Sequence, residues 1–294
     1  MSPTTNGFAS SRGQVSVSTA IGGRKTQEDR YLVHSIPNTG FVILGVFDGT
    51  VGDFVADELT RIFVPTLIMT HTWREFLALP ESADEEKRIS LIESALRETF
   101  FACDSIILKQ CEERGLDFCC STAVVAIASP SMIVTAHIGD SRAALIHKQS
   151  GYVWGEFLTC DHRPDLPVER SRIEAAGGHV VYLASRDAQP FIRGGDFERR
   201  KQLGQQPMQV QYSRAFGGKD LKIFGLSAEP AVRVTNVTES EFSLILASDG
   251  LWDSLTASQA ANLVVKAKDS PAESLVQHVL STACDNVTAV VLIF

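Results

Sequence analysis

The stretch Phe41-Val-Ile-Leu-Gly-Val-Phe47 is a short, nearly all-apolar run, and it leads directly into Asp48-Gly49. Such a run is typical of a strand that is buried on both faces. Four further stretches share this apolar character: residues 121–128, 132–138, 242–247 and 287–294. Together they predict several buried strands that are distributed along the whole chain.

Helical periodicity appears between these runs. In residues 84–115, apolar side chains recur at three- and four-residue spacing on one helix face. They are Ile89, Ile92, Leu96, Phe100, Cys103 and Ile107. Asp84 suits the N-cap, and Gly115 suits the position that follows the last turn. Shorter helices are predicted over residues 53–68 and 167–176, and the capping-box pattern Thr256-Ala-Ser-Gln259 predicts the start of another.

Strands joined by short connections, with long helices between the sets, favour layers of antiparallel or mixed sheet faced by helices. Residues 1–13 are predicted to form a flexible N-terminal lead-in, and residues 14–294 a single domain. Residues 184–211 lack periodicity and contain several glycines. They predict a long surface loop or flap, and we place this flap or insertion around residues 184–216.

Carboxylates stand at the ends of the predicted strands. Asp48, Asp140 and Asp249 follow three of the apolar runs, and Asp285 precedes the last one. Strand ends are rigid, so these side chains can converge with little loss of conformational entropy. Clustered carboxylates repel one another, and a divalent cation relieves that repulsion. Because no His or Cys is interleaved with them, the ligand set favours Mg²⁺ or Mn²⁺ over Zn²⁺.

A series of short motifs runs along the chain in a fixed order. They are Arg24-Lys-Thr-Gln-Glu28-Asp29, Val46-Phe-Asp48-Gly49, Gly139-Asp140-Ser141-Arg142-Ala143, Asp161-His162-Arg163-Pro164, Arg172-Ile173-Glu174-Ala-Ala-Gly177-Gly178, Ser213-Arg214-Ala215, Ala247-Ser248-Asp249-Gly250-Leu-Trp252-Asp253 and Asp285-Asn286-Val-Thr288. This ordered set resembles the metal-dependent protein phosphatases, also called the PPM or type 2C family. Each motif is short, but the set spans roughly residues 15–294 and is highly specific.

The resemblance implies an α+β fold with a central β-sandwich of two mostly antiparallel sheets. Helices would flank both outer faces, giving four αββα layers with a two-metal site at one edge, and residues 14–294 would form a phosphatase catalytic domain. The implied reaction is hydrolysis of phosphoserine or phosphothreonine in a phosphoprotein substrate. A metal-bridging hydroxide would attack phosphorus directly, without a phosphoenzyme intermediate.

The resemblance also implies the main site residues. Asp48 looks like the carboxylate that bridges two Mg²⁺ or Mn²⁺ ions, with the Gly49 carbonyl as a further ligand. Asp249 and Asp285 look like ligands of one ion. Arg24 is similar to the arginine that binds the substrate phosphate, for which its planar guanidinium can donate two parallel hydrogen bonds.

Further residues are implied around this centre. Glu28 and Asp29 look like water-mediated or outer ligands of the other ion. Asp140, with Asp253 nearby, resembles the ligand of a weaker third ion. Residues 213–215 look like part of a flap beside the active site.

Thr50 departs from the family pattern, which places a His two residues after the bridging Asp. That His is thought to protonate the leaving alcohol, whereas a Thr hydroxyl cannot act as a general acid near pH 7. We therefore expect a working but slowed phosphatase in which water, a metal-bound water or His162 donates the proton.

The sequence is compatible with two other functions. Thr50 also suits a pseudophosphatase that acts as a binding or regulatory scaffold, and a metallohydrolase for small phosphoesters is a third interpretation. The intact carboxylate set favours catalysis, since an empty cage of carboxylates is electrostatically costly.

The composition excludes several other classes of protein. With 27 Lys plus Arg against 35 Asp plus Glu, the net charge is −8, which leaves no overall cationic footprint for nucleic acid. No apolar run approaches the roughly 18–20 residues of a membrane span, and the polar N-terminus does not resemble a signal peptide. The six cysteines form no CxxC pair, which predicts reduced thiols. We expect a monomer in the cytoplasm or nucleus.

Overall fold

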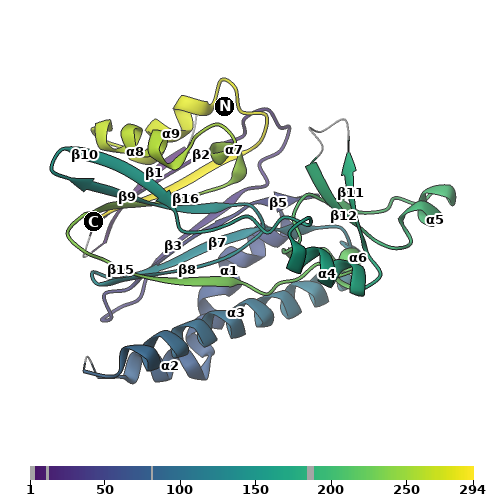
Figure 1. The fold of residues 1–294 in the computed structure, drawn as a ribbon, viewed down its shortest axis with the longest axis horizontal. Coiled ribbons are helices and arrows are strands. Elements are labelled where there is room, and N and C mark those ends of the chain that lie inside the picture. Colours follow the sequence, from purple (N-terminus) through teal and green to yellow (C-terminus); the bar gives the residue numbers. More distant parts are fainter. Residues whose placement is uncertain (1–3, 11–12, 81, 184–188) are drawn as a thin grey trace.

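Two antiparallel sheets lie face to face in the computed structural model, which describes residues 4–10, 13–80, 82–183 and 189–294 (Figure 1). The six-stranded sheet has the order β1 (Thr4–Ser10), β2 (Gly13–Ala20), β17 (Val287–Ile293), β16 (Glu241–Ala247), β9 (Arg142–Gln149) and β10 (Tyr152–Phe157). The five-stranded sheet has the order β15 (Ala231–Asn236), β8 (Met132–Ile138), β7 (Ala123–Ala128), β4 (Val42–Phe47) and β3 (Arg30–Ser35). The apolar runs of the sequence therefore form the central strands of both sheets, as predicted.

The strand β4 shows why these runs are apolar on both sides. All six of its residues are buried. Leu44 and Val46 point into the core between the two sheets, while Ile43 and Phe47 point into the core beneath the helices. Successive strand residues face opposite ways, so a strand in the middle of a layered structure must be apolar at every position.

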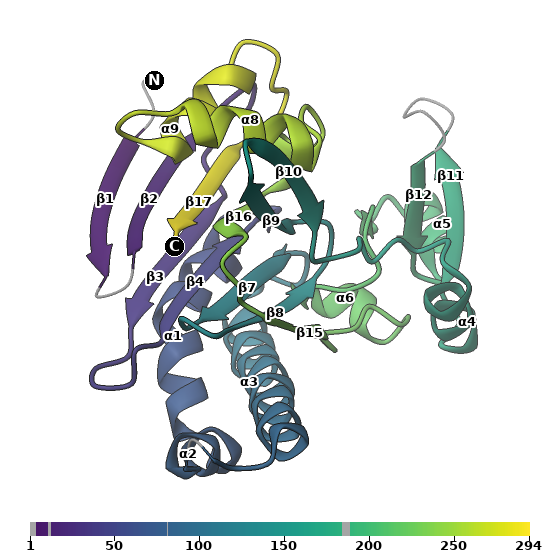
Figure 2. The same cartoon turned by 60° about the vertical axis from the view of Figure 1, so that its left-hand side comes forward.

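Helices cover both outer faces of the sandwich (Figure 2). The five-stranded sheet packs against α1 (Phe54–Met69), α2 (His71–Ala78) and α3 (Glu85–Arg114), and the six-stranded sheet packs against α7 (Asp249–Trp252), α8 (Ala257–Lys266) and α9 (Pro271–Val279). The four-layer αββα prediction is confirmed. None of the helices in the described part of the chain is both long and apolar enough to cross a membrane.

The predicted helix ends are also confirmed. The Asp84 side chain accepts a hydrogen bond from the Lys87 amide at 3.0 Å at the start of α3. The helix ends at Gly115, whose φ of 68° lies in the left-handed region that favours glycine. At the start of α8, Thr256 and Gln259 form both hydrogen bonds of a capping box.

Two predictions for irregular segments need correction. Residues 4–10 of the expected lead-in form β1, which pairs along its whole length with β2, whereas residues 1–3 and 11–12 lie outside the described residues. Pairing with a neighbouring strand is a tertiary contact that a short polar segment does not signal by itself.

The segment expected as a long loop is partly structured as well, although residues 184–188 lie outside the described residues. It contributes two strands and a helix to a small region beside the sandwich. This region consists of α4 (Pro167–Ala175), β11 (His179–Leu183), β12 (Gln189–Arg193), α5 (Phe197–Gln202), β13 (Gln209–Val210) and α6 (Lys219–Lys222). A second small sheet has the order β14 (Phe216–Gly217), β6 (Cys120–Ser121) and β5 (Gly49–Thr50). Elements of two to six residues are too short to show a period in the sequence.

Glu169 of α4 anchors this side region to the chain that follows it. Its carboxylate is 3% exposed. It accepts hydrogen bonds from Ser213 at 2.5 Å and from Arg214 at 2.5 Å, and it forms an ion pair with Arg172 at 2.8 Å. Burial raises the pKa of Glu169, but the bonds from Arg214 and Ser213 outweigh that effect and lower the pKa to about 2.

Replacing Glu169 by glutamine is expected to lower the free energy of unfolding by about 3 kcal/mol at pH 7, because the partly buried Arg172 and Arg214 lose their counter-charge. Because folding lowers the pKa of Glu169, its ionised carboxylate stabilises the fold at pH values above the ordinary pKa of a carboxylate. This stabilisation is lost as the pH falls toward about 2. The difference between wild type and variant in urea denaturation should therefore shrink below about pH 4.5. Glu174→Gln, an exposed change on the same helix, should cost less than about 0.5 kcal/mol. Equal losses in the two variants would contradict this role.

Candidate active site

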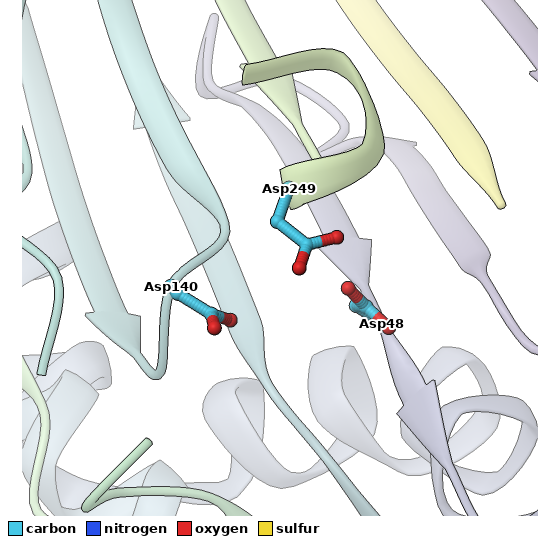
Figure 3. Close-up of side chains that lie close together, drawn as sticks. All are labelled: Asp48, Asp140 and Asp249. Carbon is cyan, nitrogen blue, oxygen red and sulfur yellow. The ribbon is translucent and has the colours of Figure 1, made fainter. Parts of the chain in front are cut away.

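Three carboxylates meet where strands of the two sheets end at one edge of the sandwich. Asp48 follows β4, Asp140 follows β8 after a single glycine, and Asp249 follows β16 and opens α7. Each offers a carboxylate oxygen, and these oxygens all lie within 4.8 Å of one another (Figure 3). The sequence predicted that these acids lie at strand ends, and the packing of the two sheets places these strand ends next to one another.

The close approach has an electrostatic cost. Burial, together with the neighbouring carboxylates, raises the pKa of Asp48 and of Asp249 well above the ordinary range. Burial and the nearby Asp161 raise the pKa of Asp140 to about 7. In addition, the Oδ1 atom of Asp249 is buried and has no hydrogen-bond partner among the described residues. A buried oxygen without a partner and a cluster of mutually repelling carboxylates both suit a hard divalent cation.

These carboxylates line a cleft of about 510 Å³, and Asp285, Glu28 and Gly49 line the same cleft. Arg24 lies at this cleft too and forms an ion pair with Asp285 at 2.5 Å. More than half of the Arg24 side chain remains exposed. The guanidinium is therefore bound to a carboxylate of the cleft while part of the side chain remains in contact with solvent.

Two predicted site residues, Asp29 and Asp253, lie near the carboxylate cluster but are not among the described residues that line the cleft. Asp29 is buried behind Glu28, where burial raises its pKa to about 6 and Ser248 donates a hydrogen bond to it at 2.8 Å. Asp253 is the C-cap residue that follows α7, and it is exposed. Residues 213–215 also differ from the expected flap, since Ser213 and Ala215 are fully buried.

Asn286 positions the loop that carries Glu28 and Arg24. Its side-chain amide donates to the carbonyls of Ile21 and Thr26 at 2.9 Å each, and its Oδ1 accepts from the Glu28 amide at 2.8 Å. The motif containing Asp285 and Asn286 was visible in the sequence, but nothing local assigned this role to the asparagine.

Thr50 lines the cleft, and the structure gives it a partner that the sequence did not indicate. Tyr212 also lines the cleft, and its hydroxyl donates a hydrogen bond to the Thr50 hydroxyl at 2.8 Å. The two residues are far apart in the sequence, so no local pattern connects them.

His162 does not meet the expectation that it donates a proton to the leaving group. Its side chain is largely buried and stacks on His137 at 4.6 Å between ring centroids, and it is not among the described residues that line the cleft. Burial, followed by the neighbouring His137, lowers the pKa of His162 to about 2. A neutral core histidine cannot supply an acidic proton near pH 7.

Known proteins are similar to this chain in both sequence and architecture. Residues 14–289 match the family profile described as Protein phosphatase 2C. The crystal structure of serine-threonine phosphatase 2C from Toxoplasma gondii is 39% identical, with a TM-score of 0.93 and coverage of 99% of both chains.

Curated plant relatives match as well. Probable protein phosphatase 2C 9 of Oryza sativa subsp. japonica is 42% identical over 144 residues, which cover 49% of this chain and 29% of the relative. Probable protein phosphatase 2C 71 of Arabidopsis thaliana is 31% identical over 300 residues, which cover 99% of this chain and 58% of the relative. The chain thus spans less than two thirds of the length of these two relatives. The profile match across most of the sequence, together with the shared architecture, shows that the chain belongs to the protein phosphatase 2C family.

Proposed function

We propose that this chain is a metal-dependent protein serine/threonine phosphatase that hydrolyses phosphoserine and phosphothreonine in protein substrates. The observation that carries the proposal is the cluster of Asp48, Asp140 and Asp249 in the cleft of a protein phosphatase 2C family member. Arg24 at the same cleft supports a substrate that carries a phosphate.

The proposed cofactors are two Mg²⁺ or Mn²⁺ ions. Asp48 would bridge them, with the Gly49 carbonyl as a further ligand, and Asp249 and Asp285 would hold one of the two. Glu28 would act on the other ion through water, with Asp29 behind it. The repulsion among the carboxylates and the unpartnered oxygen of Asp249 support this assignment.

Asp140 would bind a third, weaker ion. Its place within the cluster supports this role, whereas Asp253 would contribute only from the exposed end of α7. When bound, the ions supply an activated water as the nucleophile and offset the charge of the phosphoryl oxygens.

The protein itself would bind and orient the phosphate. Arg24 would exchange its bond to Asp285 for two parallel hydrogen bonds to the phosphoryl oxygens once a cation neutralises that carboxylate. Glu28 is held ready for its role by the amide of Gly52 at 3.0 Å and by the hydroxyl of Thr26 at 2.9 Å. The site would therefore be largely formed before substrate arrives.

Metal removal tests the proposed function directly. The purified protein should hydrolyse a phosphothreonine peptide with Mn²⁺ or Mg²⁺, and EDTA should lower the rate by at least about 10³-fold, since bound ions contribute several kcal/mol of charge stabilisation. Adding Mn²⁺ back should restore the rate. Calorimetric Mn²⁺ binding without turnover would instead support a regulatory scaffold, and turnover of aryl phosphates without any on phosphopeptides would indicate a small-molecule hydrolase.

A further inference from the structure

A chain of three hydrogen-bonding side chains ends at Thr50 in the cleft. The Cys120 thiol lies 3.2 Å from the Tyr212 hydroxyl, and the Tyr212 hydroxyl donates to the Thr50 hydroxyl at 2.8 Å. Because the single phenolic proton is given to Thr50, the thiol must be the donor in its contact with Tyr212. The Thr50 hydroxyl accepts the bond from Tyr212, so its own proton is available to another acceptor. Thr50 lines the cleft, where such an acceptor could bind.

Backbone pairing between strands fixes Thr50 and Cys120, the first and last residues of this series of hydrogen bonds. Thr50 in β5 stands directly opposite Cys120 in β6, and Cys120 is paired on its other side with Gly217 in β14. Tyr212, which is 7% exposed, bridges the two side chains. Burial raises the pKa of the Tyr212 hydroxyl well above its ordinary value and that of the Cys120 thiol to about 12, so both groups keep their protons.

The backbone beyond Thr50 is strained, which shows how firmly the segment is held. Val51 has a φ of 60°, a conformation that is a genuine outlier for a β-branched residue, and its side chain is 59% exposed. Such strain persists only where the surroundings determine the local conformation, and it concentrates at functional sites. The amide of Gly52 is tied to Glu28 in the cleft, which fixes the segment from the far side.

We infer that Thr50 is a catalytic hydrogen-bond donor to the ester oxygen of the leaving group, and that Tyr212 is the positioning residue that aims it. This inference rests on the proposed function and deepens it. The oxygen of the attacking water forms a new bond to phosphorus as the ester phosphorus–oxygen bond breaks. The electron pair of the broken bond passes to the leaving oxygen, which accepts a hydrogen bond from Thr50. Thr50 keeps its own proton, and the leaving oxygen takes a proton from water.

The benefit of this arrangement depends on the leaving group. An alkoxide carries a full, poorly stabilised charge and gains most from a donor that is already oriented. A nitrophenolate spreads its charge into the ring and needs little help. Consecutive hydrogen bonds also polarise one another, so the chain from Cys120 through Tyr212 strengthens the final donor.

Thr50→Val removes the hydroxyl while preserving the shape of the side chain. It should lower kcat on a phosphothreonine peptide by about 10- to 100-fold, which is the usual range for a hydrogen bond to a charged group. The rate on p-nitrophenyl phosphate should stay within about threefold, since that leaving group needs no donor. Thr50→Ser should restore the peptide rate to within about threefold of wild type.

Tyr212→Phe should reduce the peptide rate about tenfold and again spare the aryl ester, because the Thr50 hydroxyl loses the bond that orients it. Tyr182→Phe, which removes an exposed hydroxyl bonded to Arg170, is the matched control and should change neither rate. Equal losses on both esters in Thr50→Val, or no selective loss in Tyr212→Phe, would overturn the inference while leaving the proposed function intact. Absence of metal-dependent turnover by the wild type would overturn both.

Discussion

Replacing Asp249 by asparagine is expected to lower kcat/KM for a phosphothreonine peptide by at least about 10³-fold in saturating Mn²⁺. Mutating a residue that hydrogen-bonds to a metal ligand typically costs 10- to 100-fold in metal affinity or activity. Loss of a proposed ligand itself should cost more. Asp249 belongs to the carboxylate cluster and carries a buried oxygen without a partner in the described structure. Calorimetry should show weaker Mn²⁺ binding in parallel with the lost activity.

The same variant has an opposite effect on the metal-free protein. Burial and neighbouring carboxylates raise the pKa of Asp249, which means that its charge destabilises the fold when no cation is bound. In EDTA at pH 7, Asp249→Asn should therefore melt at a higher temperature than the wild type. Asp269→Asn, a change at an exposed aspartate, serves as the matched control and should alter neither activity nor melting. A fully active Asp249→Asn enzyme would contradict the proposed metal site.

Replacing Arg24 by alanine should lower kcat/KM by about 10²-fold or more. Hydrogen bonds to a charged group contribute about 1.5–3 kcal/mol each, and the planar guanidinium can donate two of them to a phosphate. Arg24→Lys should recover only part of the loss, because an ammonium group lacks the planar fork. Steady-state kinetics on the phosphothreonine peptide measures both changes.

The ion pair between Arg24 and Asp285 offers a second explanation for a loss of activity in Arg24→Ala. Measuring the Mn²⁺ affinity of the same variant distinguishes the two explanations. If Arg24 binds phosphate, Mn²⁺ affinity in Arg24→Ala should stay within about threefold of wild type, since only substrate contacts are lost. If Arg24 instead positions Asp285, metal affinity and activity should fall together. Arg61→Ala removes an exposed arginine of α1 that pairs with Asp57 and Glu58 and should affect neither quantity.

Much of the fold was predictable because its signals are local. The double-sided burial of β4 follows from an uninterrupted apolar run, and the ends of α3 follow from a capping aspartate and a left-handed glycine. The acids at the strand ends were equally visible. These features depend on residues within one or two turns of one another, where periodicity and capping act.

The side region and the details of the site were not predictable in this way. The short strand β12 pairs with β11 on one side and with β13 on the other, and β1 pairs with β2. His162 was a reasonable candidate for a proton donor until its burial against His137 removed it from the cleft. Each outcome depends on contacts between segments that are distant in the sequence.

By itself the sequence determined the layered fold, the family and the set of carboxylates, because strand periodicity, helix capping and ordered motifs are written in neighbouring residues. The resemblance to the family also implied that Thr50 stands where the family pattern has a histidine. Only the tertiary structure decided that Asp48, Asp140 and Asp249 lie within 4.8 Å and that Tyr212 donates to Thr50. The physical reason is that burial, which shifts a pKa and orients a hydroxyl, arises from the packing of the whole chain and not from any one segment of it.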